Sequence, residues 1–267
     1  MIGPGGAFVA PWAAAGWLAR GCWKAAGRAV DTLAFATACP ICDADAEGSG
    51  FCPGCRLELL EAHGRACPRC AMPVGPYSDV SGGCSECRGH RLGFDAAIAL
   101  GPYQGPIRQV CLMLKRDRNA WVARWLAGLV AEGRADAIRV EVEAAAGSGA
   151  CLVPVPLHWR RRLARGYNQA EALASGLGRA IGLEVSPALR RVVATPQLAL
   201  AGRAERARRM RGAFRVRRGA DLRGRTVLLV DDILTSGATS GEAARALKRA
   251  GAARVVAVVV ARAEGKP

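Results

Sequence analysis

The chain has 267 residues, 51% of them hydrophobic, and it carries a formal net charge of +16. This length fits one sizeable domain and a smaller one, and the apolar content is ample for a core. No run is long and apolar enough to span a bilayer, which excludes a transmembrane segment. The positive charge favours polyanionic partners, and a basic protein without such partners is the alternative.

Residues 1–38 are apolar and rich in tryptophan, but Arg20, Lys24 and Arg28 interrupt them. The segment lacks the early positive charge of a secretory signal, so we expect a cytoplasmic protein. We predict that it forms an amphipathic helix that packs on the rest of the protein. Contact with a membrane surface is the alternative.

Eight of the eleven cysteines form four Cys-x-x-Cys pairs within residues 39–94. Two thiolates separated by two residues can grip one tetrahedral ion, and two such pairs complete a closed four-cysteine zinc site. The sequence therefore predicts a double zinc ribbon with two structural zinc ions. Their ligands are Cys39, Cys42, Cys52, Cys55, Cys67, Cys70, Cys84 and Cys87.

The pairs can combine in two ways. Sequential sites over residues 39–55 and 67–87, built on short β-hairpins, are the first choice, and an interleaved arrangement is the alternative. A disulfide framework is disfavoured because the cysteine count is odd and no secretory signal is present. His63 and His90 are expected to be spectators, since eight cysteines fill both sites. We expect the other cysteines to be small buried residues: Cys22, Cys111 and Cys151.

Residues 95–267 alternate strand-like and helix-like segments. Strands are predicted at 96–101, 151–155, 226–230 and 254–261, and helices at 119–133, 170–181 and 240–250. Trp121 and Trp125 lie four residues apart on one helix face, which favours a place in the core. The alternation predicts an α/β domain whose mostly parallel sheet is covered on both faces. Such sheets bind ligands at the carboxyl ends of their strands.

One of these strand ends carries the sequence VLLVDDILTSGAT, from Val227 to Thr239. A tight loop leading into a helix N-terminus holds phosphate with its backbone N–H groups. Gly237 and Ala238 allow a close backbone approach, and the neighbouring hydroxyl side chains add donors. Asp231 and Asp232, just upstream, can serve ribose hydroxyls or a hydrated Mg²⁺. The stretch therefore predicts a sugar-phosphate site.

Three other phosphate-related motifs fit this stretch less well. A Walker A loop requires Gly-Lys-Ser/Thr, and no lysine is present here. The dinucleotide fingerprint G-x-G-x-x-G is absent as well. A phospho-acceptor receiver domain can begin with a similar strand, but too few residues follow Asp231 for a doubly wound domain.

These residues carry a resemblance to known families. VLLVDDILTSGAT looks like the phosphoribosyl pyrophosphate (PRPP) motif of type I phosphoribosyltransferases. The four cysteine pairs, VPVPLHWRRRLARGYNQA and the closing VVAVVVARA resemble the ComF family of competence proteins. The resemblance covers the chain from about Cys39 to its end. It implies a parallel sheet with flanking helices and a flexible hood over residues 95–267, behind the zinc-ribbon module.

The resemblance also implies roles for particular residues. Asp231 and Asp232 would be the catalytic pair that contacts ribose and organises Mg²⁺. The family's flexible loop matches residues 197–214, including Arg203 and Arg206, but Met210 stands where we expect asparagine. The 5′-phosphate would bind to Thr235, Ser236, Gly237, Ala238 and Thr239. The pyrophosphate would lie near His158, Arg160, Arg161 and Arg162.

Residues 203–225 hold ten arginines and only two acids. Such a band can close on pyrophosphate or on a nucleic-acid backbone, and a solvated connection is the alternative. The first functional hypothesis is a Mg²⁺-dependent phosphoribosyltransferase-fold protein that acts on PRPP or a 5′-phosphorylated nucleotide. By resemblance, it would serve DNA uptake beside other competence proteins. The alternatives are a non-catalytic single-stranded DNA-binding protein and a nucleotide sensor that binds partners through its zinc module.

Overall fold

The computed structural model describes residues 38–46, 50–116, 120–145, 147–194 and 202–264. The helix predicted over residues 1–38 therefore lies almost entirely outside the described residues. The described helices are α2 (Pro53–Glu61), α3 (Gly105–Met113), α4 (Ala120–Gly133), α5 (Ala135–Glu143), α6 (Trp159–Arg165), α7 (Gln169–Ile181), α8 (Arg203–Met210) and α9 (Ala238–Arg249). The strands are β1 (Ala96–Pro102), β2 (Ala150–Pro154), β3 (Leu189–Arg191), β4 (Phe214–Val216), β5 (Thr226–Leu234) and β6 (Arg254–Arg262).

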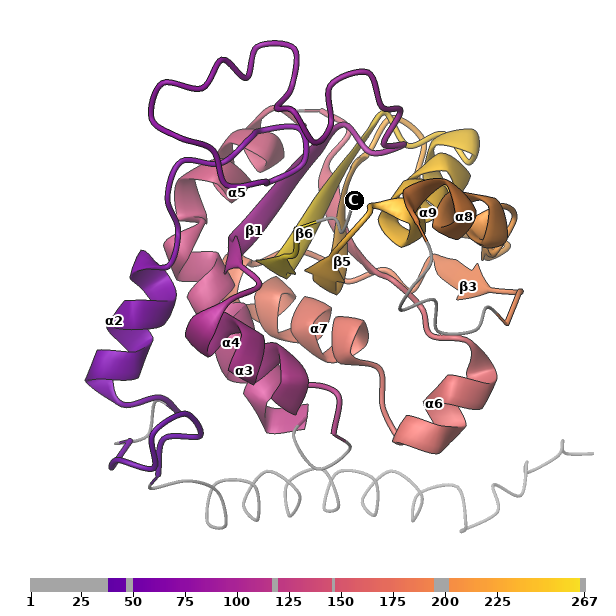
Figure 1. The fold of residues 1–267 in the computed structure, drawn as a ribbon. Helices are drawn as coiled ribbons and strands as arrows, with labels where there is room; N and C mark the ends of the chain where they lie inside the picture. The colour runs from indigo at the N-terminus through magenta and orange to yellow at the C-terminus, as the bar shows by residue number, and fades with distance from the viewer. Residues whose placement is uncertain (1–37, 47–49, 117–119, 146, 195–201, 265–267) are drawn as a thin grey trace, which may run out of the picture.

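Four parallel strands form the central sheet in the order β1-β6-β5-β2 (Figure 1). β5 and β6 lie in its middle, and Asp231 pairs in register with Val259. Both strands are near-continuous apolar runs with most residues buried, as expected for strands covered on both faces. The predicted α/β class is confirmed.

Alternate residues of β5 enter two different cores. Leu228 and Val230 pack in the core that includes side chains of α3, α4 and α7. Val227 and Leu229 pack in the core that includes α9, β3 and β4. The period of two along a strand produces this division. Figure 1 shows α4 and α7 side by side on one side of the sheet and α9 with α8 on the other.

A small antiparallel sheet of β3 and β4 lies on the α9 side, and α8 packs beside α9. We call β3, β4 and α8 the hood. The family resemblance implies a flexible loop over residues 197–214, but within this segment Arg203–Met210 form α8. In this helix Glu205 pairs with Arg208 and Arg209, one turn further along, and so offsets the crowded positive charge.

The two cysteine groups differ in how they join the fold. Phe51, Cys55 and Leu59 of the first group's segment are buried in the same core as α4 and α7. The second group has a small apolar cluster of its own with Met72. In the described part of the two cysteine segments the predicted hairpins are not formed, and the antiparallel pairing there is limited to single bridges at Ala38–Asp45 and Ala66–Pro73. Cys55 comes instead from the first turn of α2.

Trp121 and Trp125 pack edge to face, with ring centroids 4.6 Å apart, and both contact the first core. Their predicted structural role is confirmed. Cys111 and Cys151 are fully buried, as expected, whereas Cys22 lies outside the described residues. Among the helices in the described part of the chain, none combines the length and apolarity needed to cross a bilayer.

Candidate functional site

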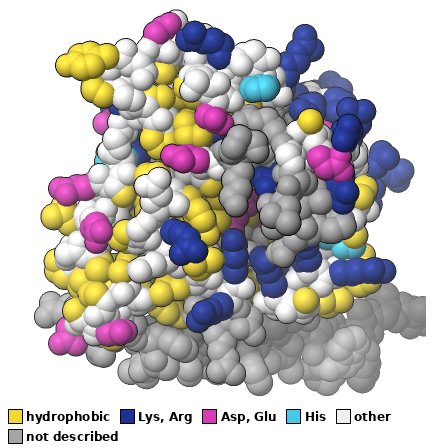
Figure 2. Space-filling view, viewed as in Figure 1, with side chains coloured by type: hydrophobic (Ala, Val, Ile, Leu, Met, Phe, Trp, Pro, Cys, Tyr) yellow, Lys and Arg dark blue, Asp and Glu magenta, His cyan; other side chains and the backbone are white. Residues whose placement is uncertain are grey.

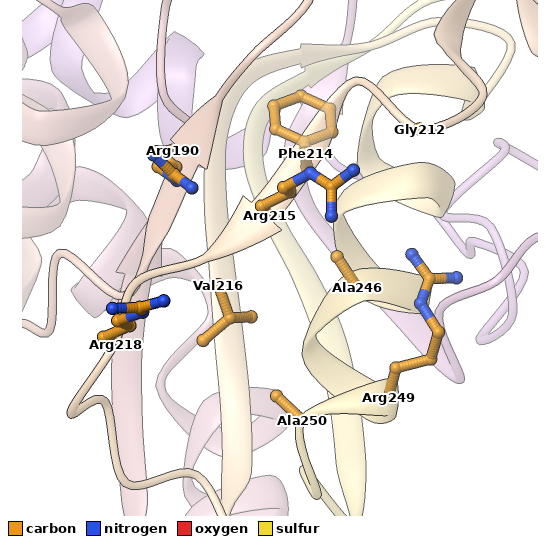
Figure 3. A pocket seen from close by; sticks show the side chains of 9 residues that line it. All are labelled: Arg190, Gly212, Phe214, Arg215, Val216, Arg218, Ala246, Arg249 and Ala250. Carbon is orange, nitrogen blue, oxygen red and sulfur yellow. The ribbon is translucent and has the colours of Figure 1, made fainter.

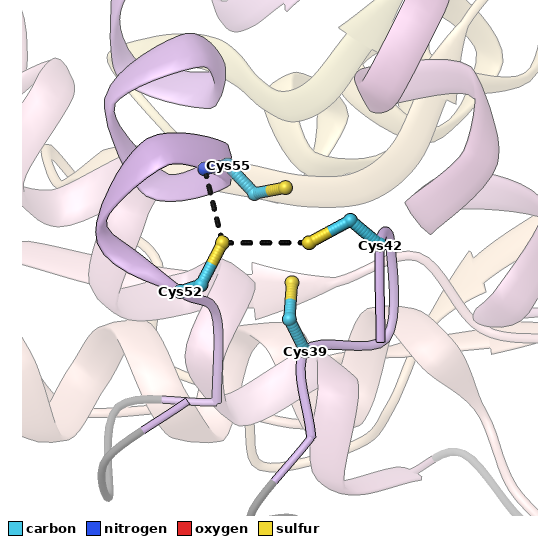
Figure 4. A group of neighbouring side chains, drawn as sticks. All are labelled: Cys39, Cys42, Cys52 and Cys55. Atoms are coloured by element: carbon cyan, nitrogen blue, oxygen red, sulfur yellow. Dashed lines mark hydrogen bonds between the residues drawn. The ribbon is translucent and has the colours of Figure 1, made fainter. Parts of the chain in front are cut away.

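The first cysteine group converges on one point. The Sγ atoms of Cys39, Cys42, Cys52 and Cys55 all lie within 4.8 Å of one another (Figure 4). Those of Cys42 and Cys52 are 3.5 Å apart. Four thiolates at about 2.3 Å from a zinc ion form a tetrahedron with edges of about 3.8 Å. The group therefore fits a structural zinc ion.

The second group has the same geometry. Its four Sγ atoms also lie within 4.8 Å of one another, with 3.7 Å between Cys67 and Cys87 and 3.5 Å between Cys70 and Cys84. Sequential pairing of the Cys-x-x-Cys motifs is therefore confirmed, and the interleaved alternative is excluded. Both sites are closed, so each can hold zinc but leaves no open position for catalysis.

Backbone N–H groups favour the thiolate form of one cysteine in each group. Burial alone would raise the pKa of Cys39, but the N–H groups of Cys52, Ile41 and Cys42 outweigh it and lower that pKa to about 7. The pKa of Cys67 is lowered to about 7 in the same way, by N–H groups of its own site. Burial and the neighbouring thiols raise the pKa of Cys55 and Cys70, so without a metal ion the thiols of each group do not all ionise readily. Thiolate is the form that binds metal ions, and a bound cation would offset the repulsion between adjacent thiolates.

The end of β5 presents the predicted acids. The backbone N–H of Asp232 donates to Asp231 Oδ1 at 2.9 Å, and that of Ile233 donates to Asp232 Oδ1 at 2.9 Å. Burial raises the pKa of Asp231, and the neighbouring carboxylate of Asp232 raises it further. A bound cation would offset both effects, because it stabilises adjacent negative charges.

The loop after these acids turns sharply into α9. Gly237 has φ = +76°, a left-handed conformation that favours glycine, and it caps the N-terminus of the helix. Ser236 Oγ accepts a hydrogen bond from the N–H of Ala238 at 3.4 Å. The positive end of the α9 dipole and its first N–H groups point at this loop, which suits a phosphate.

A cavity of about 490 Å³ brings the acids and the loop together. Asp231, Asp232, Thr235, Ser236 and Thr239 all line it. Five cationic side chains from other elements complete the wall: Lys115, Arg161, Arg165, Arg191 and Arg206. Figure 2 shows Lys and Arg gathered on the right of this face, over the region of α6, α8 and β3 in Figure 1.

Of the predicted pyrophosphate residues, only Arg161 lines this cavity. Arg160 lies over the ring of Trp159, 5.2 Å from its centroid. Arg162 pairs with Glu171 at 2.8 Å. His158 is buried as the N-cap of α6, where its Nδ1 accepts from the N–H of Arg160 at 3.4 Å. Of the four predicted residues in HWRRR, one therefore lines the cavity, and the other three make contacts within α6 or with its surroundings.

Sequence reasoning missed several lining residues. Arg191 comes from β3 in the hood, and no motif marks it. Its pKa is lowered by burial and by the nearby charge of Arg161, and Asp231 opposes that shift. Arg191 therefore lies between a cation and an acid of the site. Lys115, just after α3, and Arg165, at the end of α6, were also missed. Arg206 was among the predicted loop residues, and it does line the cavity.

Gln169 is a further missed residue, at the start of α7. Its side chain is buried and lines the cavity, yet Oε1 has no hydrogen-bond partner among the described residues. A buried amide oxygen without a donor costs about 1–3 kcal/mol. A ligand hydroxyl would satisfy it. The signal was present in Tyr-Asn-Gln, where Asn168 caps the helix and directs Gln169 inward.

A buried arginine connects the second cysteine group to the loop that precedes α9. Arg262 donates to the carbonyl of Cys70 at 2.8 Å and to the carbonyls of Leu234 and Thr235 at 3.1 and 2.8 Å. The first turn of α9 also touches the segment after the second site. A Cβ on Gly241 would lie 2.0 Å from the carbonyl oxygen of Leu92. The zinc site and the loop thus form one packed unit.

Known families match the two parts of this chain. The double zinc ribbon domain family matches residues 30–88, and the phosphoribosyl transferase domain family matches residues 165–267. The fold and site define a phosphoribosyltransferase-fold protein that carries a double zinc ribbon.

Relatives share most of their length with the chain. It is 27% identical to Competence protein F of Haemophilus influenzae, over 80% of this chain and 91% of the relative. It is 29% identical to DNA utilization protein YhgH of Escherichia coli K12, over 77% of this chain and 94% of the relative. Competence protein ComFC of Bacillus subtilis is 25% identical, over 77% and 80%. The chain is therefore similar over most of its length to proteins named for competence and for DNA utilization.

Proposed function

We propose that the cavity binds PRPP or a 5′-phosphorylated nucleotide together with Mg²⁺. One observation carries the proposal: a single cavity joins an acid pair, a left-handed glycine loop at a helix N-terminus, and five cations from other segments of the chain, two of them in α6. These are the complementary groups for a metal-bound ribose, a 5′-phosphate and a pyrophosphate.

The loop Thr235–Thr239 receives the 5′-phosphate. Backbone N–H groups at the start of α9 face it, and the hydroxyl groups of Thr235, Ser236 and Thr239 add donors. Gly237 holds the turn in a conformation that side chains rarely adopt. This subsite does not need a metal ion, because helix dipole and N–H groups supply the positive potential.

Asp231 and Asp232 serve the ribose and the metal. Carboxylate oxygens are the ligands that Mg²⁺ prefers, so the donor set fits this ion. When bound, Mg²⁺ would neutralise charge on the pyrophosphate. The free amide oxygen of Gln169 would accept a hydrogen bond from a ligand hydroxyl. Together these oxygens orient the sugar in the middle of the cavity.

Arg161, Arg165, Arg191 and Lys115 are four of the five cations in the wall. We assign the pyrophosphate to them. In a transfer reaction the C1–O bond of PRPP breaks, and its electron pair leaves with pyrophosphate while an acceptor lone pair bonds to C1. Fixed cations stabilise the charge that develops on the leaving group. We propose that the protein is a pentosyl transferase, with an acceptor that no motif identifies.

The names of the relatives suggest a setting for this activity. Competence protein F and DNA utilization protein YhgH are named for competence and for DNA use. We propose that this chain also acts in handling DNA taken up by the cell, beside other competence proteins. Eight free thiols in two metal sites suit a reducing compartment, which supports a cytoplasmic location.

Calorimetry on two variants tests the site. Gly237→Val should abolish binding of both a nucleoside 5′-monophosphate and PRPP, because valine opposes the left-handed turn. Gly182→Val is the matched control, since Gly182 has φ = +70° but caps the C-terminus of α7. Asp231→Asn with Asp232→Asn should keep much of the monophosphate affinity but lose Mg²⁺-enhanced PRPP binding.

Two outcomes would contradict these assignments. Unchanged monophosphate binding in Gly237→Val would remove the phosphate-loop assignment. Wild-type affinity for Mg²⁺-PRPP in the double Asn variant would show that the acids do not serve the metal. Release of pyrophosphate from PRPP, measured with a panel of nucleobases, tests turnover itself.

A further inference from the structure

A second basic depression lies between the small sheet of the hood and α9. It has a volume of about 440 Å³ and shares no lining residue with the cavity described above. Arg190, Arg215 and Arg218 come from β3, β4 and the turn after β4, and Arg249 comes from the last turn of α9 (Figure 3). We call this depression the arginine groove.

The charges of the arginine groove have no structural explanation within the fold. Arg190 and Arg215 are direct partners across the β3–β4 pair, where like charges destabilise a sheet. Both are exposed, as is Arg218, and these three arginines have no hydrogen-bond or ion-pair partner among the described residues. An arrangement that costs stability and lacks internal partners points to an external anion.

The fourth arginine is only weakly compensated. Arg249 is 3.8 Å from Glu242, and that carboxylate already holds Arg245 at 2.8 Å. Among the described residues, the lining of the groove includes no acid. The groove therefore presents several guanidinium groups to one ligand, and guanidinium is the side chain best suited to phosphate.

The floor of the groove narrows the choice of ligand. Val216, Ala246 and Ala250 lie between the arginines, so an apolar surface separates the charged rims (Figure 3). A single nucleic-acid strand has this pattern, with phosphates that repeat along a chain and flat base faces between them. A duplex keeps its bases stacked inside and cannot place them against such a floor.

We propose that the arginine groove binds the phosphodiester backbone of a single-stranded nucleic acid. The groove includes the C-terminal end of α9, whereas the phosphate loop lies at its N-terminal end, about 16 Å away along the helix at 1.5 Å per residue. The two sites are thus separate. Strand binding does not depend on the proposed binding of PRPP.

The probe is a labelled oligothymidine with a 5′-hydroxyl end, which lacks the terminal phosphate that the other site would recognise. Its affinity is measured by fluorescence anisotropy over a series of salt concentrations. In Arg215→Gln with Arg218→Gln, the affinity should fall about 10-fold or more. The slope of log affinity against log salt should decrease by about 0.7 for each lost phosphate contact.

The control removes the same charge elsewhere. Arg208 and Arg209 are exposed on α8 and pair with Glu205, so Arg208→Gln with Arg209→Gln should bind the strand nearly as well as the wild type. The groove variant should melt at or above the wild-type temperature, since it relieves like-charge repulsion, and should keep its affinity for a nucleoside monophosphate.

Three results would overturn the proposal. Equal loss of strand affinity in both double variants would mean that only net charge matters. Tighter binding of a duplex of the same sequence would contradict the role of the apolar floor. Inorganic polyphosphate that binds as tightly as the strand, with the same loss in the groove variant, would show that the groove selects a phosphate chain and not a nucleic acid.

Discussion

Arg262 donates a hydrogen bond from Nε to the carbonyl oxygen of Cys70 at 2.8 Å. Its Nη1 donates to the carbonyls of Leu234 and Thr235, where the loop proposed to bind phosphate begins. One buried guanidinium therefore fixes a zinc ligand's backbone and the loop at the same time. Arginine suits this place because its donors form a rigid fork, which lysine cannot reproduce.

Replacing this arginine tests the link. Arg262→Lys should lower the free energy of unfolding by about 1–3 kcal/mol, because buried carbonyl groups lose their donors. It should also weaken binding of a nucleoside 5′-monophosphate. Arg254→Lys is the control on the same strand, where Arg254 pairs with Glu141 near the surface. Chemical denaturation and calorimetry measure both effects, and equal changes in the two variants would contradict the link.

Purified protein should contain two zinc ions per chain, because two closed four-cysteine sites are present. Elemental analysis measures this. Cys55→Ser should retain one zinc and destabilise the whole chain, since Cys55 and Leu59 belong to the main core. Cys111→Ser, a buried cysteine outside both groups, should retain both ions. Fewer than two zinc ions in the wild type would exclude the double site.

A single added methyl group should disturb the contact between the ribbon and α9. Gly241→Ala places a Cβ 2.0 Å from the Leu92 carbonyl oxygen, so the backbone must shift at a cost of about 1–3 kcal/mol. Gly128→Ala in α4 meets nothing within 4 Å and should stabilise the protein by up to about 1 kcal/mol, as alanine favours helix. Thermal melts of the two variants should therefore move in opposite directions.

The acid pair should cost stability at neutral pH. The folded protein raises the pKa of Asp231 above its ordinary value near 3.8, so the folded state binds this proton more tightly than the unfolded chain. Stability is then lost as the pH rises through that window. Asp231→Asn removes this loss of stability because asparagine does not ionise, so it should raise the melting temperature by about 2–4 °C near pH 7. The gain should vanish near pH 3.

Asp79 provides a control of opposite sign. The backbone N–H and the hydroxyl of Ser81 lower its pKa, so its ionised form is favoured in the folded state. Asp79→Asn should show no gain at neutral pH. Saturating Mg²⁺ should reduce the gain of Asp231→Asn if the metal binds the acid pair. A gain that is independent of pH would contradict the assignment to ionisation.

The β5 strand, its acids and the glycine loop could be predicted because all of them lie within thirteen consecutive residues. Arg191 and Lys115 could not, since they reach the cavity from distant segments and only the tertiary fold brings them there. His158 illustrates a different limit. A histidine before three arginines resembles a ligand-binding residue, but here it caps a short helix.

The zinc ribbon also could not be assigned fully from its spacing. The cysteine pattern indicates two closed sites, but it does not tell which core the residues between them will enter. Phe51 and Leu59 join the core of the main sheet. The apolar pattern of so short a segment does not indicate which part of the protein it packs against. Likewise, α8 was not predicted as a helix, because its many arginines suggest a solvated loop. Their positive charge is partly offset only when the helix places Arg208 and Arg209 beside Glu205.

The strand order has a consequence for how this protein is made. β6 is the last strand along the described chain, yet it lies between β1 and β5. During synthesis β1 and β5 leave the ribosome with unpaired edges, and neither edge is covered until β6 follows. The sheet therefore closes only after Arg254–Arg262 has emerged, far along the chain from Ala96–Pro102. Such late, long-range pairing slows folding and exposes strands that can aggregate, so we expect the newborn chain to depend on chaperones more than a helical protein of equal length.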